Sequence, residues 1–260
     1  MKAVTFSRLE HYGRLGNQLF QVCAVAAHAK KHDATPFIRS DWAYRPFFRL
    51  PEEWYDPIPV DADLTDLEGY FQEYPIFEEF IDEVNDWFTP SVEEMNVLAP
   101  MGLETPLTDS KPVASLHIRR GDYVKHADLF PFPGDKYYGD AIDDIKSRHG
   151  DDTSFIVFSD DFQWSKDFLS KFDAKFFLVK GVATPVEVRK RKNAPQDQHD
   201  LFLQSFCDEH IIANSSFSYW GAMLAKNDKV IYPERWWGPA VPEIADLHKM
   251  FPSTWRKFEC

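Results

Sequence analysis

Short apolar runs alternate with amphipathic stretches along most of this chain. Apolar residues at helical spacing predict five helices, over residues 17–32, 136–148, 163–172, 197–207 and 216–226. The apolar runs around them predict six strands, over residues 2–7, 113–118, 154–159, 175–179, 210–213 and 229–232. Strands that alternate with helices in this way indicate parallel sheets covered on both faces, and therefore an α/β fold.

The middle of the chain breaks this alternation. Four prolines between residues 90 and 112 punctuate a stretch with little periodicity, which indicates a connection between two lobes. We expect residues 1–108 to form an N-terminal lobe and residues 109–260 a C-terminal lobe, with a cleft between them. Whether the last helix of the chain packs back on the N-terminal lobe is left open by this prediction. Ligands of such sheets bind beyond the carboxyl ends of the strands, so the residues that follow each strand are the functional candidates.

The net charge of the chain limits the kinds of partner that it can bind. The chain has 260 residues, and its 29 lysines and arginines stand against 42 aspartates and glutamates, a formal net charge of −13. A phosphate backbone repels a protein this acidic, so we exclude nucleic acid as a partner.

The compartment is indicated by cysteine usage and by the lack of long apolar runs. Cys23, Cys207 and Cys260 lie far apart, which fits a reducing compartment rather than a disulfide framework. No apolar run approaches the ~18 residues of a membrane span, and the start of the chain predicts a strand rather than a signal peptide. We expect a cytoplasmic protein, with a peripheral association with a membrane left open.

One predicted strand runs directly into the sequence Arg-Arg-Gly-Asp. An arginine presents planar paired donors that fit phosphate or carboxylate oxygens, and it stays charged at any working pH. Alternation along the strand places His117 and Arg119 on one face and Ile118 and Arg120 on the other. We expect Arg119 to face the cleft and bind an anion, while Arg120 pairs with an acid such as Asp122. The alternative is a solvated turn with one surface salt bridge.

Two other strand ends carry polar residues. Ser215 or Ser216 caps a helix, and a helix N-terminus with free N–H groups and hydroxyls suits a phosphate, although a plain cap explains the same residues equally well. Asp160 and Asp161 also follow a strand. Paired acids there could bind a divalent metal or the N–H edge of guanine, or cap the next helix.

The loop between the first strand and the first helix contains Gly13, Gly16 and Asn17. Its glycines allow a tight turn, but their spacing is not the dinucleotide fingerprint Gly-x-Gly-x-x-Gly, which makes a dehydrogenase remote. Asn17 is a candidate cap of its helix. The nine histidines are scattered, with no paired spacing on one helix, and give no support to a metal site.

Taken together, these segments resemble the α-1,2-fucosyltransferase family, glycosyltransferase family 11. The resemblance spans nearly the whole chain, with the motifs in the family's order. The motifs are 13–21 (GRLGNQLFQ), 69–72 (GYFQ), 117–123 (HIRRGDY), 158–161 (FSDD), 200–224 (DLFLQSFCDEHIIANSSFSYWGAML) and 229–237 (KVIYPERWW).

This resemblance implies a GT-B-like fold of two Rossmann-like lobes and a reaction that needs no metal and no cofactor. It implies the inverting transfer of L-fucose from GDP-fucose to the 2-hydroxyl of a glycan, with a terminal β-galactoside as the acceptor. GDP-fucose and that glycan are the implied partners.

The donor-binding residues that the resemblance implies in the C-terminal lobe all lie at strand ends. They are His117, Arg119, Arg120, Asp161, Ser215 and Ser216. Arg119 and the helix that starts at the two serines would stabilise the β-phosphate as negative charge grows there. His117 and Asp161 would lie at the guanine–ribose end of the donor.

The N-terminal lobe contributes the opposite side of the implied site. Gly16, Asn17 and Gln18 would close over the donor. Two carboxylates are candidates for a general base, Asp122 beside the phosphate motif and Glu73 on the acceptor side.

Two alternatives to this function stay open. One is a metal-dependent glycosyltransferase that uses Asp160 and Asp161 as its cation site. The other is a protein that binds a GDP-sugar or a glycan without turnover.

Overall fold

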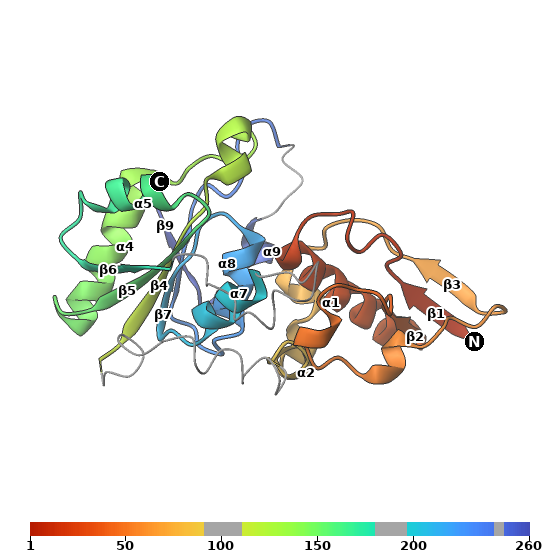
Figure 1. Ribbon diagram of the computed structural model, residues 1–260. Helices are drawn as coiled ribbons and strands as arrows, with labels where there is room; N and C mark the ends of the chain where they lie inside the picture. Colours follow the sequence, from red (N-terminus) through yellow and green to blue (C-terminus); the bar gives the residue numbers. More distant parts are fainter. Residues whose placement is uncertain (91–110, 180–196, 242–246) are drawn as a thin grey trace, which may run out of the picture.

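The computed structural model describes residues 1–90, 111–179, 197–241 and 247–260, which form two lobes (Figure 1). The described part of the N-terminal lobe, red to orange in the figure, contains a parallel sheet in the order β2-β1-β3. Its strands and α-helices are β1 (Lys2–Thr5), α1 (Leu15–His32), β2 (Thr35–Phe37), β3 (Asp63–Asp66) and α2 (Ile81–Trp87). Its 3-10 helices are η1 (Arg45–Phe47), η2 (Glu52–Tyr55), η3 (Tyr74–Ile76) and η4 (Glu78–Phe80).

The C-terminal lobe is built on a parallel sheet in the order β6-β5-β4-β7-β8-β9. Its strands are β4 (Val113–Ile118), β5 (Ser154–Ser159), β6 (Lys175–Leu178), β7 (Glu209–Ile211), β8 (Val230–Pro233) and β9 (Arg256–Phe258). Its helices are η5 (Gly121–His126), α4 (Gly134–His149), α5 (Phe162–Leu169), α7 (Asp197–Ser205), α8 (Ser216–Met223) and α9 (Leu247–Met250).

Helices cover both faces of the C-terminal sheet, which explains why all six residues of β4 are buried. Leu116 and Ile118 of β4 pack with residues of α4 and α5 in one core cluster. Val113 belongs to a second cluster, which includes residues of α7 and α8 on the other face. Figure 1 shows these two pairs of helices on opposite sides of the strands. The period-2 alternation predicted for this strand is therefore confirmed.

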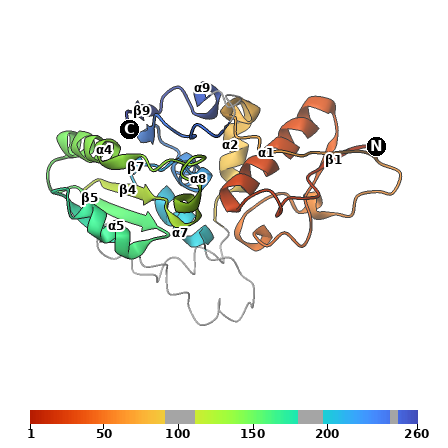
Figure 2. The same ribbon diagram turned by 90° about the horizontal axis from the view of Figure 1, so that it is seen from above.

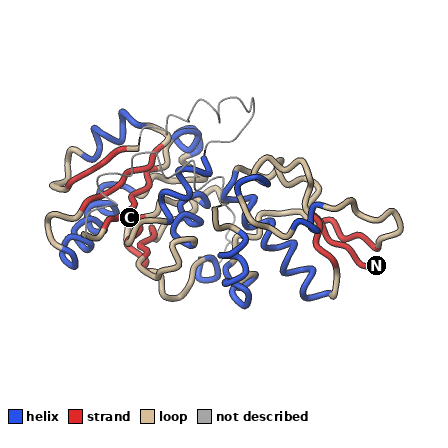
Figure 3. The backbone as a smooth tube through the Cα atoms, turned by 60° about the horizontal axis from the view of Figure 1, so that its bottom comes forward, coloured by secondary structure: helices blue, strands red, loops and turns tan. Residues whose placement is uncertain are grey.

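The second core cluster continues from the C-terminal lobe into the N-terminal lobe through α1 and α8. The ring of Phe20 on α1 lies 4.8 Å from that of Tyr219 and 4.9 Å from that of Trp220 on α8. Gly16 makes this close approach possible, because a Cβ atom there would lie 2.6 Å from the backbone nitrogen of Phe217. The two sheets lie at opposite ends of the molecule with helices between them (Figure 3), and Figure 2 shows α1 beside α8 from above.

The predicted α/β class and the two Rossmann-like lobes of a GT-B-like fold are confirmed. All six predicted strands and all five predicted helices occur, with ends displaced by a few residues. Three short strands were not predicted, because none of them is an apolar run: β2 contains Pro36, β3 reads DLTD with every residue exposed, and β9 reads RKF. The proposed boundary at residue 108 lies outside the described residues. The short helix α9 contacts η3 of the N-terminal lobe.

Within the described ranges, no helix combines the length and the apolar character that crossing a membrane requires.

Candidate active site

β4 and β7 are neighbouring strands in the C-terminal sheet, and the order in which strands are added reverses between them. From β4 the chain continues through β5 to β6 on one side, and through β7, β8 and β9 on the other. Adjacent strands whose connections diverge leave a crevice beyond their carboxyl ends, the usual ligand site of such sheets. The segments that follow these strands, residues 119–123 and 214–216, are the two that carry the strongest polar motifs.

Arg119 is held at this crevice by two carboxylates. Its Nη1 lies 2.6 Å from Oδ2 of Asp160, and its Nη2 donates to Oδ1 of Asp122. The guanidinium carbon lies 5.0 Å from the ring centroid of Tyr123, and the side chain is 15% exposed. A guanidinium fixed on several sides loses little conformational freedom when it binds an anion.

Asp160 also shapes the backbone that carries Arg119. Its Oδ1 accepts hydrogen bonds from the backbone N–H groups of Arg120, at 2.8 Å, and of Gly121, at 3.1 Å. A Cβ atom on Gly121 would lie 2.3 Å from Oδ2 of Asp160, so the turn accommodates this carboxylate only with glycine at that position. One side chain therefore holds both the turn and the arginine.

Arg120 pairs with an acid as expected, but the acid is Asp161 and not Asp122. Its guanidinium stacks on the ring of Trp164, 3.8 Å from the centroid, and its Nε lies 3.4 Å from Oδ2 of Asp161. Arg120 continues the alternation of β4 and so lies on the α5 side of the sheet. Asp122, on the other face, lies instead beside Arg119.

Asp122 joins the two lobes. Its Oδ1 accepts from Arg119, and its Oδ2 lies 3.6 Å from Nη2 of Arg14, in the loop before α1. The side chain of Asp122 is half exposed. This ion pair connects the two arginine-containing motifs across the crevice.

Asp161 caps the helix that follows β5. It is the N-cap residue of α5, and its side chain accepts from the backbone N–H of Trp164 at 3.3 Å. The capping alternative is therefore confirmed, and Oδ2 of Asp161 additionally pairs with Arg120. Its predicted contact with guanine stays a prediction.

The two serines that follow β7 have different positions in the structure. Ser215 is the N-cap of α8, and its Oγ accepts from the backbone N–H of Phe217 at 3.3 Å. Ser216, the first residue of α8, lines a cavity between the lobes. A phosphate placed near this helix start would meet free backbone N–H groups.

His117 is buried on β4 and belongs to the core rather than to the cavity wall. Burial, and in second place the charge of Arg119, lowers the pKa of His117 to about 3, so the ring is neutral. Its Nδ1 has no hydrogen-bond partner among the described residues. Its ring centroid lies 5.6 Å from that of Phe217 at the start of α8.

The N-terminal motif contributes one residue to the cavity and two to packing. Asn17 lines the cavity, and its Oδ1 accepts from Nε2 of Gln72 at 2.6 Å. Gln18 is buried and turned into its own lobe, where Oε1 accepts from Nε1 of Trp42 at 2.8 Å. Gly16 packs against α8, as described above. The expectation that Asn17 caps its helix is wrong, because Arg14 occupies the N-cap position.

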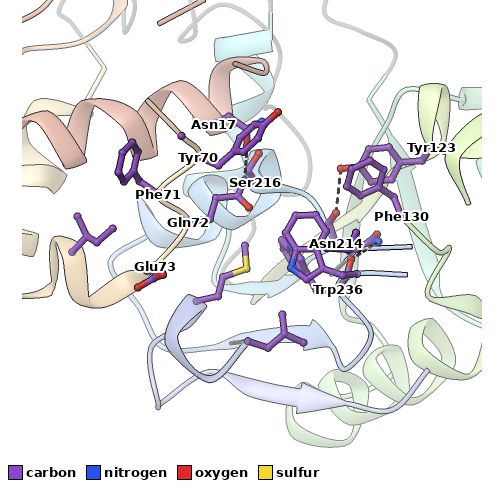
Figure 4. A pocket seen from close by; sticks show the side chains of 16 residues that line it. Asn17, Tyr70, Phe71, Gln72, Glu73, Tyr123, Phe130, Asn214, Ser216 and Trp236 are labelled. Carbon is purple, nitrogen blue, oxygen red and sulfur yellow. Dashed lines mark hydrogen bonds between the residues drawn. The ribbon is translucent and has the colours of Figure 1, made fainter. Parts of the chain in front are cut away.

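A cavity of about 670 Å³ lies between the lobes, with Tyr123 on its wall (Figure 4), and the guanidinium of Arg119 lies 5.0 Å from the Tyr123 ring centroid. Residues of both lobes line it: Asn17, Gly69, Tyr70, Phe71, Gln72, Glu73, Ile76, Tyr123, Phe130, Asn214, Ser216, Trp236, Trp237, Val241, Leu247 and Met250. Its volume lies in the range of small-molecule sites. Of the predicted site residues, Asn17, Glu73 and Ser216 lie on its wall, and Arg119 and Asp122 lie beside it through Tyr123.

The aromatic wall of this cavity was not identified as a site from the sequence. Tyr123 lies in η5, Phe130 in the loop that follows η5, and Trp237 in the loop after β8, and the fold brings the two connections together. The Trp236–Trp237 pair and the GYFQ segment were visible in the sequence as family motifs, and they were the available signal.

Metal ligands are not assembled in the described parts of the chain. No group of three histidine, cysteine, aspartate or glutamate side chains lies there in a position to hold an ion. Asp160 and Asp161 instead face guanidinium and backbone N–H groups.

Comparison with known proteins places these motifs in a family. The family model described as glycosyl transferase family 11 matches residues 17–240. An α-1,2-colitosyltransferase of Escherichia coli is 31% identical over 173 residues, which are 65% of this chain and 54% of that protein. Galactoside α-(1,2)-fucosyltransferase 1 of Homo sapiens is 26% identical over 253 residues, covering 84% of this chain and 65% of that protein. The chain thus spans about half the length of the bacterial relative.

A solved structure has a similar arrangement at low sequence identity. The α-1,6-fucosyltransferase NodZ, soaked with GDP-fucose, superposes with a TM-score of 0.49 at 12% identity. The superposition covers 86% of this chain and 92% of that chain.

Proposed function

Because the chain belongs to glycosyl transferase family 11, we propose that it transfers L-fucose from GDP-fucose to the 2-hydroxyl of a glycan that ends in a β-galactoside. The transfer inverts the configuration at the donor carbon and uses no metal ion. The observation that carries this proposal is Arg119, held by two carboxylates at the carboxyl end of β4 and beside a cavity between the lobes. The relatives named for α-1,2 transfer support the linkage.

The reaction exchanges one bond to the donor carbon for another. The acceptor oxygen attacks C1 of fucose, and the bond from C1 to the β-phosphate oxygen breaks. The bonding electron pair leaves with GDP, whose β-phosphate gains negative charge. The proton of the acceptor hydroxyl passes to a carboxylate.

Arg119 is assigned to the β-phosphate. A guanidinium can place two N–H donors against phosphate oxygens, and charge placed in advance stabilises the transition state more than the ground state. The free N–H groups at the start of α8, beside Ser216, add to this stabilisation. Together they would supply the positive charge that a metal ion supplies in other transferases.

Glu73 is assigned as the proton acceptor, and Asp122 as a residue that orients Arg119. Glu73 lines the cavity from the N-terminal lobe, where an acceptor would lie. Asp122 is engaged with Arg119 and Arg14 instead. The metal-dependent alternative is not favoured, because a cation at Asp160 and Asp161 would have to displace their contacts with the two arginines.

Release of GDP from GDP-fucose tests the proposal, measured with and without a β-galactoside acceptor. We expect acceptor-dependent release at the same rate in excess chelator and in added manganese. Strict dependence on a divalent ion would refute the metal-free reaction, and donor binding without release would identify a non-catalytic binding protein. Nucleotide-activated colitose, assayed in parallel, tests the choice of donor sugar.

A further inference from the structure

The cavity between the lobes contains a buried amide whose orientation is determined by the fold. Asn214 follows β7 and is 1% exposed. Its Nδ2 donates to two backbone carbonyls, that of Pro131 at 2.9 Å and that of Trp236 at 3.1 Å. Because both partners are acceptors, the nitrogen must face them, and the amide cannot be reversed. Its Oδ1 is buried without a hydrogen-bond partner among the described residues.

A second unpartnered polar atom belongs to the same wall. Nε1 of Trp237 is buried and has no acceptor in the described part of the chain. Asn214 and Trp237 both line the cavity, and Figure 4 shows Asn214 beside Trp236 at this end of it. A buried donor and a buried acceptor that both lack partners are costly, unless a ligand satisfies them.

The rest of this wall is aromatic. The rings of Tyr123 and Phe130 are stacked, with centroids 4.4 Å apart and planes 18° apart. The ring of Phe130 lies 5.6 Å from that of Trp237. These three residues therefore form a continuous apolar surface beside the two unpartnered polar atoms.

No described residue that lines the aromatic end of the cavity, beside Asn214 and Trp237, carries a cationic side chain that would bind an anion. Among the cavity's described lining residues there is one carboxylate, that of Glu73, and no lysine or arginine. The phosphates of a nucleotide sugar belong with Arg119, at the edge of the cavity. A neutral ligand with hydroxyl groups fits this end of the cavity, since a hydroxyl can donate to Oδ1 of Asn214 or accept from Nε1 of Trp237.

We propose that this cavity is the subsite for the acceptor sugar. One pyranose hydroxyl donates to Oδ1 of Asn214, another accepts from Nε1 of Trp237, and a C–H face of the ring packs on the aromatic surface. This assignment rests on the proposed function for its choice of sugar, a terminal β-galactoside. Asn214 and Trp237 are positioning residues for the acceptor and take no part in the bond exchange.

Trp237→Phe tests the assignment, because it removes the N–H donor and keeps an aromatic ring. Asn214→Ala is less suitable, since it also deletes the two bonds from Nδ2. At saturating GDP-fucose, we expect the acceptor KM of Trp237→Phe to rise about 5- to 30-fold, the range for a buried hydrogen bond. The donor KM should stay unchanged. Trp87→Phe, a partly buried tryptophan on α2 in the N-terminal lobe, is the matched control and should keep the wild-type acceptor KM.

Monodeoxy derivatives of methyl β-D-galactopyranoside make the test specific. In the wild type, removal of the hydroxyl that accepts from Trp237 should lower kcat/KM. In Trp237→Phe, the same removal should have no further effect. If Trp237→Phe has a wild-type acceptor KM, or if every deoxy derivative loses as much activity with the variant as with the wild type, the assignment is wrong.

Binding measurements separate this inference from the proposed function. Titration of methyl β-D-galactopyranoside is followed by tryptophan fluorescence in the wild type and in Trp237→Phe. A quench that Trp237→Phe abolishes, in a protein that does not turn over GDP-fucose, would support the sugar subsite and refute the proposed function. Turnover that proceeds equally well in both proteins would support the function and overturn the subsite.

Discussion

Replacing Asp160 by alanine is expected to reduce activity far more than it reduces stability. This carboxylate accepts two backbone N–H groups of the Arg-Arg-Gly-Asp turn, at 2.8 and 3.1 Å, and lies 2.6 Å from Nη1 of Arg119. The three residues in these contacts, Arg119, Arg120 and Gly121, are not among the residues that line the cavity. We therefore expect Asp160 to influence the reaction by holding Arg119 in position.

The magnitudes follow from these contacts. A hydrogen bond to a charged acceptor contributes about 1.5–3 kcal/mol when it is buried. Because the Asp160 side chain is 27% exposed, water replaces part of each interaction, and an exposed ion pair contributes only about 0–1 kcal/mol. We expect Asp160→Ala to lower the free energy of unfolding by about 2 kcal/mol. A displacement of Arg119 by about 1 Å would lower kcat by about 100-fold.

Asp160→Asn separates the two roles of the carboxylate. Its amide oxygen can still accept the two backbone N–H groups, but the charge that faces Arg119 is lost. We expect a loss of stability below about 1 kcal/mol, as for an exposed ion pair, and a fall in kcat intermediate between the wild type and Asp160→Ala.

Urea unfolding and initial rates of GDP release measure the two effects on the same preparations. Asp140→Ala is the matched control, because Asp140 pairs with Lys136 on the exposed side of α4. It should change neither quantity appreciably. A destabilised Asp160→Ala that retains the wild-type kcat would show that Asp160 only supports the turn, and the positioning argument would be refuted.

Four further substitutions test other parts of the site and the fold. Arg119→Lys keeps the charge but loses the planar paired donors, so kcat should fall about 100-fold with little change in donor affinity; a near-normal kcat would remove Arg119 from the phosphate site. Asp161→Ala should cost about 1 kcal/mol of stability through the lost cap; if Asp161 also contacts guanine, calorimetry will show a smaller preference for GDP over ADP, and an unaltered ratio would leave only the cap. Gly16→Ala places a Cβ atom 2.5 Å from the carbonyl carbon of Ser216, so the lobes must separate slightly, and both the melting temperature and kcat should fall; full activity would mean that the contact is adaptable. Burial raises the pKa of Asp200 to about 6, so this group favours the folded state less as the pH rises from about 4 through 6, and Asp200→Asn should remove that part of the pH dependence of unfolding. Parallel pH profiles for wild type and variant would disprove the last expectation.

The sequence was sufficient for the elements with strong periodicity. The core strands β4 and β5 are short, mainly apolar runs that are buried on both faces, and the sequence predicted both with the bounds that the structure has, because helices cover both sides of the sheet. The strands β3 and β9, which lie at edges of the two sheets, were not predictable in this way. β3 is exposed along its whole length and β9 has three residues, so pairing with a neighbouring strand, not side-chain burial, decides their conformation.

The residues of the candidate site were likewise predictable from the sequence only in part. Residue type and a place after a core strand made Arg119, Asp122 and Ser216 candidates, since parallel strands bring their carboxyl ends to one edge of the sheet. The partner of each arginine was not determined by the sequence. Successive residues after β4 point to opposite faces, and only the packed structure shows that α5 brings Trp164 to one of them.

The aromatic wall of the cavity was decided by tertiary structure alone. Phe130 and Trp237 are more than one hundred positions apart in the sequence, and their rings meet because the loops after η5 and β8 pack together. The buried amide of Asn214 likewise acquires its orientation from carbonyls of those two loops. Local patterns determined which residues end the strands. The unpartnered atoms that the cavity presents to a ligand depend on contacts between distant loops, which no local pattern records.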